Sequence, residues 1–337
     1  MVTHNNDNQQ QARVVKLLRN NILTLQELMD KLSITKQQAQ EAITKLQEQG
    51  ITPHIRIQGK KTTYHINTLP ERNNTYLISE ASNNQETLQF AATSDWHFAS
   101  TFFLSKTWHE AMKATRDAGI TKVYVAGDIV DGSQIYKGHL ENLVTYSVEK
   151  QTDMVAGALS KYPELDFWGI AGNHDYSFTQ QNGAKPLAIL AAKAPNFKNL
   201  GDFQADVIYQ GIKIRLLHGA GGRAYATSYP SQTYLRDYFK GLDREEMPNI
   251  PHLMIIGHFH TLYQGKDHGI HILQCGSFQD SSNEYCIRRG LTGPNGLFHV
   301  TTEIQQGTIL SFNTKYIEPN REGKGKAFSK TTKNYQP

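Results

Sequence analysis

Cysteine is scarce in this sequence, since Cys275 and Cys286 are the only two among 337 residues. Two cysteines cannot build a disulfide framework, so we expect a cytoplasmic protein held together by a buried core. Long apolar runs are lacking too: the longest, such as residues 253–256, fall far short of the ~20 residues that cross a bilayer. The N-terminal residues lack the basic-then-apolar pattern of a secretory signal. At ~150 residues per domain, the length favours about two domains.

Charge of one sign is also in short supply, because the net charge is only +4. Its distribution is uneven: residues 1–66 contain nine Lys or Arg against five Asp or Glu, whereas residues 67–337 are balanced overall. Basic residues gather again at the C-terminus, where residues 319–337 are expected to form a basic flexible tail. A local positive excess favours a polyanionic partner such as DNA, although a solvated surface explains so small an excess equally well.

Residues 12–66 carry the signals of three short helices followed by a hairpin. Thr24 and Thr35 each begin a capping-box sequence, which predicts helices starting near both residues. Around Gly59, apolar residues alternate with polar ones on both sides of a turn, which predicts a β-hairpin over residues 51–66. This order resembles a winged helix-turn-helix domain. We expect a disordered tail over residues 1–11 before it and a polar linker over residues 67–87 after it.

The winged-helix resemblance implies where nucleic acid would bind. The third helix of such a domain enters the major groove, and the wing contacts phosphates. The implied DNA-binding residues are Lys36, Gln37, Gln40 and Lys45 on the third helix and Lys60 and Lys61 on the wing. Glu41 on the same helix face weakens this interpretation, and winged helices also dock proteins. A DNA-binding role and a protein-docking role therefore both stay open.

From residue 88 onward, apolar strands repeatedly end in clusters of Gly, Asp, Asn and His. Predicted strands at 88–93, 123–126, 165–171, 212–217, 253–256 and 271–275 surround predicted helices near 105–118, 140–160 and 184–194. Because α/β proteins build their sites at the carboxyl ends of strands, we expect the following side chains to converge. They are Asp95, His97, Asp128, Asn173, His174, His218, His258 and His260. Imidazole, carboxylate and carboxamide groups without a thiolate suit divalent Mn, Fe or Zn rather than a structural zinc site.

The ordered motifs D-x-H, G-D-x-x-D, G-N-H-D, H-G and G-H-x-H resemble the calcineurin-like metallophosphoesterase superfamily. The resemblance implies an α/β fold over residues 88–318, a four-layer αββα sandwich that follows the small N-terminal winged-helix (α+β) domain. It also implies two divalent metal ions, with Mn preferred and Fe, Zn or Mg as alternatives. The first ion would be held by Asp95, His97, Asp128 and His260, and the second by Asp128, Asn173, His218 and His258.

The same resemblance implies roles for two further residues. His174 would not ligate a metal but would protonate the leaving group beside the scissile phosphate. Asp175 would orient His174. A hydroxide bridging the two ions would be the nucleophile, because two cations lower the pKa of bound water.

The substrate is less well defined by the sequence. Gly132 and Ser133 stand where the protein Ser/Thr phosphatases of the family carry an Arg, which argues against that activity. A looser resemblance links the chain to the branch that contains double-strand-break repair nucleases and archaeal DNA polymerase small subunits. The expected substrate contacts are Tyr136, Lys137, Arg223, Tyr225 and Arg288, although the tyrosines could equally pack a helix and the arginines could equally lie on the surface.

Three functions remain open at this point. The favoured one is a two-metal nuclease that hydrolyses DNA phosphodiester bonds, with the winged helix delivering the DNA and a protein partner such as an ATPase. The second is a phosphatase or phosphodiesterase acting on small nucleotides or other phosphoesters, with the winged helix docking a protein. The third is an inactive binding protein that keeps the fold, which the complete ligand set makes the weakest of the three.

Overall fold

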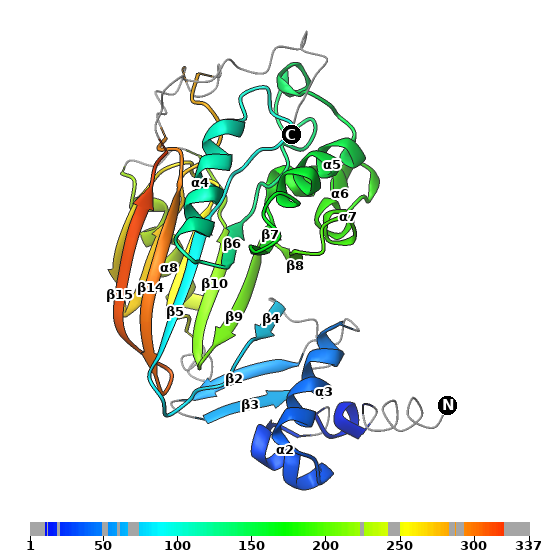
Figure 1. The fold of residues 1–337 in the computed structure, drawn as a ribbon, viewed down its shortest axis with the longest axis vertical. Helices are drawn as coiled ribbons and strands as arrows, with labels where there is room; N and C mark the ends of the chain where they lie inside the picture. Colours follow the sequence, from blue (N-terminus) through cyan, green and yellow to red (C-terminus); the bar gives the residue numbers. More distant parts are fainter. Residues whose placement is uncertain are drawn as a thin grey trace.

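Two six-stranded β-sheets packed face to face form the centre of the protein (Figure 1). The computed structural model describes residues 11, 13–18, 21–48, 53–58, 61–66, 74–222, 226–241, 250–282, 287 and 293–319. The tails expected over residues 1–11 and 319–337 therefore lie almost wholly outside the described residues. Within the described residues, we find no helix whose length and apolar character would let it span a bilayer.

The first large sheet has the strand order β15-β14-β5-β6-β7-β8. Strands β5 to β8 run parallel, and β14 and β15 add an antiparallel hairpin at one edge. Their bounds are β5 Glu86–Thr93, β6 Lys122–Ala126, β7 Asp166–Ala171, β8 Phe197–Asp202, β14 Leu297–Gln305 and β15 Thr308–Ile317. Between the parallel strands lie α4 Ser105–Asp117, the 3₁₀ turn η1 His139–Asn142, α5 Val148–Leu159, α6 Asn173–Asn182 and α7 Pro186–Lys193. The single helix predicted near 140–160 is thus two separate elements.

The second large sheet has the order β12-β13-β11-β10-β9-β4. Its bounds are β4 Asn74–Leu77, β9 Gln204–Tyr209, β10 Ile212–His218, β11 Leu253–Gly257, β12 Tyr263–Asp267 and β13 Ile270–Gln274. Strands β10, β11 and β13 are parallel, whereas β9 runs antiparallel to β10. Helix α8, Tyr229–Gly241, lies between β10 and β11 in the chain.

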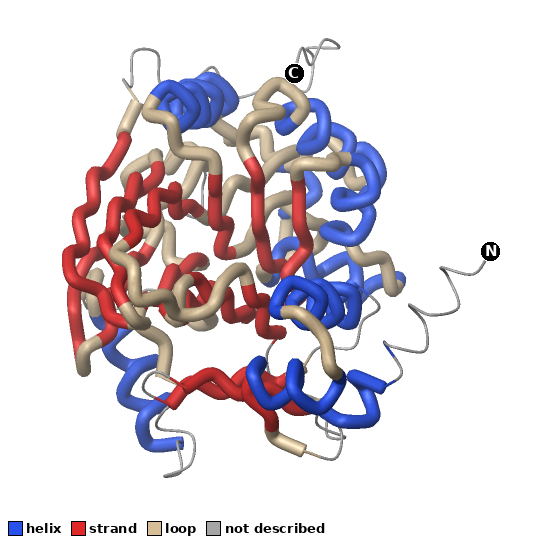
Figure 2. The backbone as a smooth tube through the Cα atoms, turned by 60° about the horizontal axis from the view of Figure 1, so that its bottom comes forward, coloured by secondary structure: helices blue, strands red, loops and turns tan. Residues whose placement is uncertain are grey.

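Apolar side chains on both faces of each sheet explain why the strands read as nearly continuous apolar runs. Between the sheets pack Phe90 and Tyr124 from the first sheet and Ile214 from the second. Helices α4 to α7 cover the outer face of the first sheet around Trp108, and α8 covers the second through Leu235. Figure 2 shows the strands of the sandwich in the interior with helices along its outside. The predicted α/β sandwich with two sheets is confirmed.

The N-terminal module, residues 13–66 as far as they are described, contains helical and strand elements in the expected order. Helical residues 13–18 are followed by β1 Leu23–Thr24, α2 Leu25–Leu32, α3 Lys36–Glu48, β2 His54–Gln58 and β3 Lys61–His65. Both predicted capping boxes form: Thr24 pairs with Glu27, and Thr35 pairs with Gln38. Strand β3 lies between β1 and β2 in a small sheet.

The segment expected as a linker, residues 67–87, contains a strand. Residues 74–77 form β4, which pairs in parallel with β9 at the edge of the second sheet. Edge pairing uses backbone groups and needs no apolar pattern, which is why the polar composition misled the prediction. Leu77 and Ile208 share the hydrophobic core of the N-terminal module, and the Tyr64 hydroxyl donates to the Glu80 carboxylate. The module is therefore packed against the sandwich and does not hang on a free linker.

The N-terminal module lies at one end of the sandwich, below the two large sheets in Figure 1. It contacts Ile208 near the end of β9, and Ile208 pairs with Lys213 near the beginning of the antiparallel strand β10. His218 ends β10 five residues further on. At ~3.3 Å per residue the two levels are about 17 Å apart along the strand. The module thus occupies the end of the sandwich opposite the carboxyl ends of β5, β6, β7, β10 and β11.

Candidate metal centre

The expected ligands meet at the carboxyl ends of five strands. Asp95 and His97 follow β5, Asp128 follows β6, and Asn173 begins α6 directly after β7. From the second sheet, His218 is the last residue of β10, and His258 and His260 follow β11. Since β5, β6 and β7 are parallel, as are β10 and β11, all these ends lie at the same end of the sandwich. The structure brings all seven predicted ligands together.

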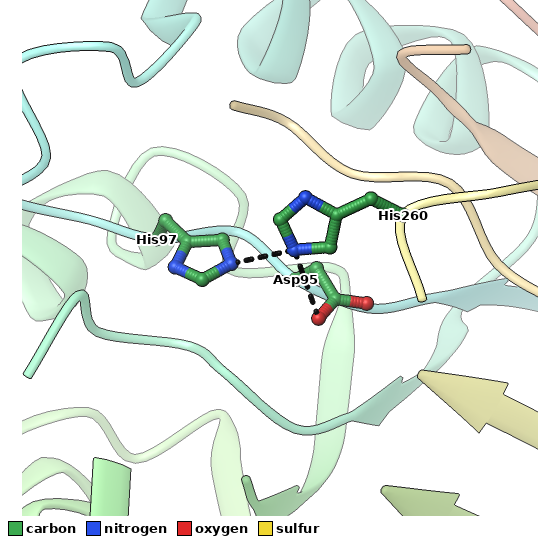
Figure 3. Close-up of side chains that lie close together, drawn as sticks. All are labelled: Asp95, His97 and His260. Atoms are coloured by element: carbon green, nitrogen blue, oxygen red, sulfur yellow. Dashed lines mark hydrogen bonds and ion pairs between the residues drawn. The ribbon is translucent and has the colours of Figure 1, made fainter. Parts of the chain in front are cut away.

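One group of donors consists of Asp95, His97 and His260 (Figure 3). The Nε2 atoms of His97 and His260 lie 2.9 Å apart, and His260 Nε2 lies 3.4 Å from Asp95 Oδ1. Asp128 completes this group, with Oδ2 at 4.0 Å from His97 Nε2. Ligands ~2.1 Å from one cation and at right angles to each other lie about 3 Å apart. These spacings therefore fit a single divalent ion.

The second group of donors shares Asp128 with the first. His218 Nε2 lies 3.2 Å from Asp128 Oδ2 and 3.0 Å from Asn173 Oδ1. His258 Nδ1 lies 2.9 Å from the same Asn173 oxygen. The donors are a carboxylate, a carboxamide and two imidazoles, a mixture that suits borderline divalent metals. The residues present therefore fit a pair of divalent ions with Asp128 between them.

Burial and the neighbouring charged groups shift the pKa values of the expected ligands. Burial alone would raise the pKa of Asp128, but His218, His174 and His97 hold it well below its usual value. Burial alone would lower the pKa of His218, yet Asp128 and Asp95 raise it to about 9. Burial lowers the pKa of His97, and the neighbouring His174 lowers it further. Asp95 and Asp128 are thus anionic, and neither has a Lys or Arg partner among the described ion pairs. Their negative charge favours the binding of cations.

Five of the expected ligands have left-handed backbones. The φ angles are 53° at Asp95, 54° at His97, 52° at Asp128, 86° at His258 and 52° at His260. Such conformations are uncommon for residues other than glycine and cost roughly 1–3 kcal/mol each. The strain is concentrated at this end of the sandwich, where the chain must turn sharply after each strand to aim a donor inward.

Two motif glycines are explained by close packing. A Cβ atom on Gly172 would lie 2.2 Å from Asp128 Oδ1, and one on Gly127 would lie 2.4 Å from His218 Nδ1. Gly127 also has a φ of 93°. A larger residue at either position would therefore push on a ligand directly.

Hydrogen bonds behind the ligands fix their orientation. His218 Nδ1 lies 2.8 Å from the carbonyl oxygen of Ala126, so Nδ1–H is the donor to the backbone and Nε2 is the nitrogen that faces the other ligands. His97 Nδ1 lies 2.8 Å from Asp131 Oδ1. The backbone N–H of His258 donates to both carboxylate oxygens of Asp95, at 3.0 and 2.9 Å. These contacts hold the donor atoms in the geometry that a metal requires.

His174 lies beside both groups. Its backbone N–H donates to Asp128 Oδ1 at 2.8 Å, and its Nδ1 lies 2.6 Å from the carbonyl oxygen of Asp131 and 3.4 Å from Asp131 Oδ1. Burial opposes protonation of its ring, but Asp128 and Asp131 raise the pKa of His174 to about 10. The side chain keeps 14% of its surface exposed. A protonated imidazole that solvent can reach is a suitable proton donor.

The expected role of Asp175 is corrected by the structure. Its carboxylate does not orient the His174 ring but accepts hydrogen bonds from the backbone N–H groups of Ile129, Val130 and Gly172, at 2.8–3.2 Å. Asp175 is the third residue of α6, so its side chain turns back to the N-cap and ties the loop after β6 to the helix. Burial, and then Asp128, raise its pKa to about 7.

Asp131 takes the orienting position that the sequence assigned to Asp175. Its carboxylate contacts three imidazoles, those of His97, His174 and His139. The distance from Asp131 Oδ2 to His139 Nε2 is 3.3 Å. Hydrogen bonds from these rings hold the pKa of Asp131 well below its usual value despite burial. His139 is almost fully buried, and sequence reasoning missed it because it belongs to no motif.

The predicted substrate contacts are placed only in part. Tyr136 is 39% exposed, and the centroid of its ring lies 4.6 Å from that of His139. The His139 ring in turn contacts the His174 ring, so Tyr136 is separated from His174 by His139. Lys137, the next residue, is exposed. Arg223, Tyr225 and Arg288 lie outside the described residues.

The predicted DNA-binding residues are not brought to the metal centre. Lys36, Gln37 and Lys45 are exposed on α3, Gln40 is partly exposed, and Lys61 is exposed on β3. They belong to the N-terminal module at the opposite end of the sandwich. Lys60 lies outside the described residues.

Comparison with known proteins agrees with this architecture. The calcineurin-like phosphoesterase family model matches residues 88–285, more than half of the chain. The DNA polymerase II small subunits of Archaeoglobus fulgidus and Methanothermobacter thermautotrophicus are 25% and 23% identical to it over 224 and 232 residues. These matches cover 55% and 57% of this chain and 45% and 48% of the relatives, so the chain spans about half the length of those relatives.

Two solved structures show more distant likenesses. Vacuolar Protein Sorting 29 from Cryptosporidium parvum has a TM-score of 0.35 at 13% identity, over 69% of this chain and 98% of that one. A predicted phosphoesterase from Streptococcus pneumoniae has a TM-score of 0.32 at 10% identity, over 69% and 99%. Neither likeness bears on function. The family match, however, covers most strands of the sandwich and all the strand ends at which the expected ligands stand, and this protein belongs to the calcineurin-like phosphoesterase family.

Proposed function

We propose that this protein is a two-metal phosphodiesterase that hydrolyses DNA. The observation that carries the proposal is the pair of donor groups that share Asp128, with the partly exposed His174 beside both. Two divalent ions held there would neutralise the phosphoryl oxygens and lower the pKa of a water between them. Manganese suits this donor set, and Fe, Zn and Mg remain alternatives.

The side chains would then divide the work between binding and proton transfer. Asp95, His97 and His260 would hold the first ion, and Asn173, His218 and His258 the second, with Asp128 shared. His174 would give its proton to the departing oxygen of the substrate, because that oxygen leaves as an alkoxide unless it is protonated. Asp131 would keep the His174 ring in place and favour its protonated form. Asp175 would act on the fold of the loop that carries Asp128 and not on the chemistry.

DNA as the substrate is supported by three observations. The curated relatives are named as subunits of a DNA polymerase, the positive excess lies in the N-terminal module, and Tyr136 and Lys137 are exposed near His174. A catalytic partner protein is part of this proposal. The N-terminal module would bind DNA some distance from the cut, because it lies at the far end of the sandwich. Direct delivery of one short DNA segment from α3 to the metal centre is therefore not part of the proposal.

The experiment is manganese-dependent cleavage of end-labelled single- and double-stranded DNA, with bis(p-nitrophenyl) phosphate in parallel. The wild-type chain is compared with His174→Ala and with Asn173→Ala. We expect DNA cutting by the wild type and at least a hundredfold loss in both variants, since general-acid catalysis alone contributes roughly 10²–10⁴-fold. DNA cutting that survives both substitutions would contradict the proposal. Removing the whole module would expose Ile208 and Leu77, so point variants on α3 are preferable to a truncation.

A second candidate function is supported by the placement of the N-terminal module. If the module docks a protein, as its distance from the metal centre also allows, the site would act on small nucleotides or other phosphoesters. Hydrolysis of the small diester without DNA cutting, together with salt-insensitive or absent DNA binding, would favour this second function.

A further inference from the structure

We propose that Phe203 and Tyr176 form an aromatic platform next to the second donor group, on which a nucleobase of the substrate stacks. The inference rests on the proposed use of the metal centre for phosphoesters and adds the class of substrate, a nucleotide or nucleic acid. Neither residue belongs to a motif of the sequence. Three features support the platform: the place of Phe203 in the fold, the conformation of its backbone, and the groups beside its ring.

Phe203 is the residue at which the chain passes from one large sheet to the other. It is the single residue between β8, which ends at Asp202, and β9, which begins at Gln204. Its backbone N–H donates to the carbonyl oxygen of Ala171 at 2.8 Å, and its own carbonyl oxygen accepts from the N–H of His218 at 2.7 Å. Phe203 is thus tied to the ends of both strands that lead to the second donor group, β7 before Asn173 and β10 at His218.

The choice of phenylalanine at this turn is not explained by the fold. The φ of Phe203 is 61°, a conformation that favours Gly or Asn and disfavours a bulky side chain. The residue is also 36% exposed, so little burial offsets the strain. An exposed apolar ring held in a strained conformation beside a candidate metal centre is the kind of feature found at binding sites.

The Tyr176 ring lies against Phe203. The ring centroids are 4.9 Å apart and the planes are inclined by 60°, so the two rings form a corner. Tyr176 stands on α6 three residues after Asn173, and residues three apart lie on the same side of a helix. The two rings therefore come from two elements that also position the second donor group, the sheet crossing tied to β7 and β10 and the start of α6.

Polar groups border the platform. On the Tyr176 side, a pocket of about 200 Å³ is lined by Tyr176 together with Lys185, Asn199 and Asp202, the last being the neighbour of Phe203 in the chain. Lys185 and Asp202 are exposed, and Asn199 is partly exposed. An exposed aromatic ring with donors and acceptors nearby, beside a candidate metal centre that would bind phosphate, matches the parts of a nucleotide: base, polar base edge and phosphate. The rings give affinity for any base, because every base has a π-face.

The test is calorimetric binding of deoxyadenosine 5′-monophosphate and 2-deoxyribose 5-phosphate to the full-length protein with Mn²⁺. The two ligands differ at C1′, where one carries adenine and the other a hydroxyl group, so their ratio of affinities reports the contribution of the base separately from phosphate binding. Phe203→Gly removes the ring and suits the positive φ, and Phe203→Trp keeps an aromatic ring. Leu310→Ala, at a 52% exposed position on β15, is the control for a general effect of losing exposed apolar surface.

We expect the wild type, Phe203→Trp and Leu310→Ala to prefer the nucleotide by roughly 10- to 100-fold, the range that stacking of one base gives. Phe203→Gly should bind both ligands alike. Equal binding of the two ligands by the wild type, or a preference that survives in Phe203→Gly, would overturn the proposal. The binding assay does not depend on turnover. A wild type that prefers the nucleotide but cleaves no diester would therefore support the platform and contradict the proposed hydrolysis.

Discussion

Raising the pH should tighten the binding of a divalent cation to the second donor group, and the structure sets the size of the effect. In the metal-free protein the pKa of His218 is raised to about 9, so at neutral pH its ring carries a proton that a metal must displace. His258 and His97 have pKa values lowered by burial and are neutral above about pH 6.5. The Asp128 carboxylate is already ionised. An ion that binds to the second donor group should therefore displace the proton of His218.

One released proton corresponds to a tenfold change in the apparent dissociation constant per pH unit. Between about pH 6.5 and 8.5 the apparent dissociation constant should fall by about a hundredfold, and it should level off near pH 9. The stability of the metal-free protein should change in the opposite sense. Because the folded-state pKa of His218 lies above its unfolded value, this stabilisation is complete below about pH 6.5 and is lost as the pH rises through about 9. A rise of about 2.5 units sets an upper bound of about 3 kcal/mol.

The assay is calorimetric titration of the metal-free protein with Mn²⁺ in two buffers of different ionisation heat, which counts the protons released. The matched variants are His218→Gln, which should release about one proton fewer than the wild type, and His109→Gln, a half-buried histidine on α4 away from the centre, which should behave as the wild type. Thermal melts with and without Mn²⁺ should show a gap that widens with pH. An affinity that does not change with pH in the wild type, or equal numbers of protons released by the wild type and His218→Gln, would refute the reasoning.

Three other groups of residues give further predictions. Asp175→Ala should lower the free energy of unfolding in urea by several kcal/mol, because three buried N–H groups lose their acceptor at about 1–3 kcal/mol each. Asp175→Asn should lower it by less. Equal stability of both variants and the wild type would contradict this. Asp131→Asn should lower kcat for bis(p-nitrophenyl) phosphate by roughly 10- to 100-fold with little change in KM, because it disturbs the orientation of His174; a change in KM alone would point to another role. Charge reversal at Lys36 and Lys45 should weaken DNA binding and make the slope of log affinity against log salt shallower by about 0.9 for each phosphate that is no longer neutralised. The control Lys106→Glu on α4 should leave the slope unchanged. Identical slopes for all variants would contradict DNA binding by α3.

The convergence of the expected ligands could be predicted from the sequence because each follows an apolar strand and lies next to a glycine or a motif partner. Parallel strands place their carboxyl ends together, so the order of Asp95, Asp128, Asn173, His218 and His258 along the chain was enough to predict that they converge. No helix direction or side-chain rotamer entered that prediction.

The neighbours of the ligands could not be predicted in the same way. Whether Asp131 or Asp175 faces His174 depends on which way successive residues point at the start of α6. Sequence spacing does not encode that direction. His139 reaches Asp131 from a 3₁₀ turn that has no motif, and Phe203 stands at a turn that the strand pattern left unassigned. Strand β4 was missed because it pairs through its backbone at a sheet edge, where a polar sequence suffices.

The position of the N-terminal module has a consequence for any DNA that touches both ends of the sandwich. The module meets the sandwich near Ile208, and the candidate metal centre begins at His218, about 17 Å further along the strand direction at ~3.3 Å per residue. At about 3.4 Å per base pair, a duplex held at both places spans at least about five base pairs between them. The length of the strands would then set the distance between the bound DNA segment and the cut. Cuts would fall at a fixed offset from the bound segment whatever the sequence in between, and the offset would change only if the sandwich itself became taller.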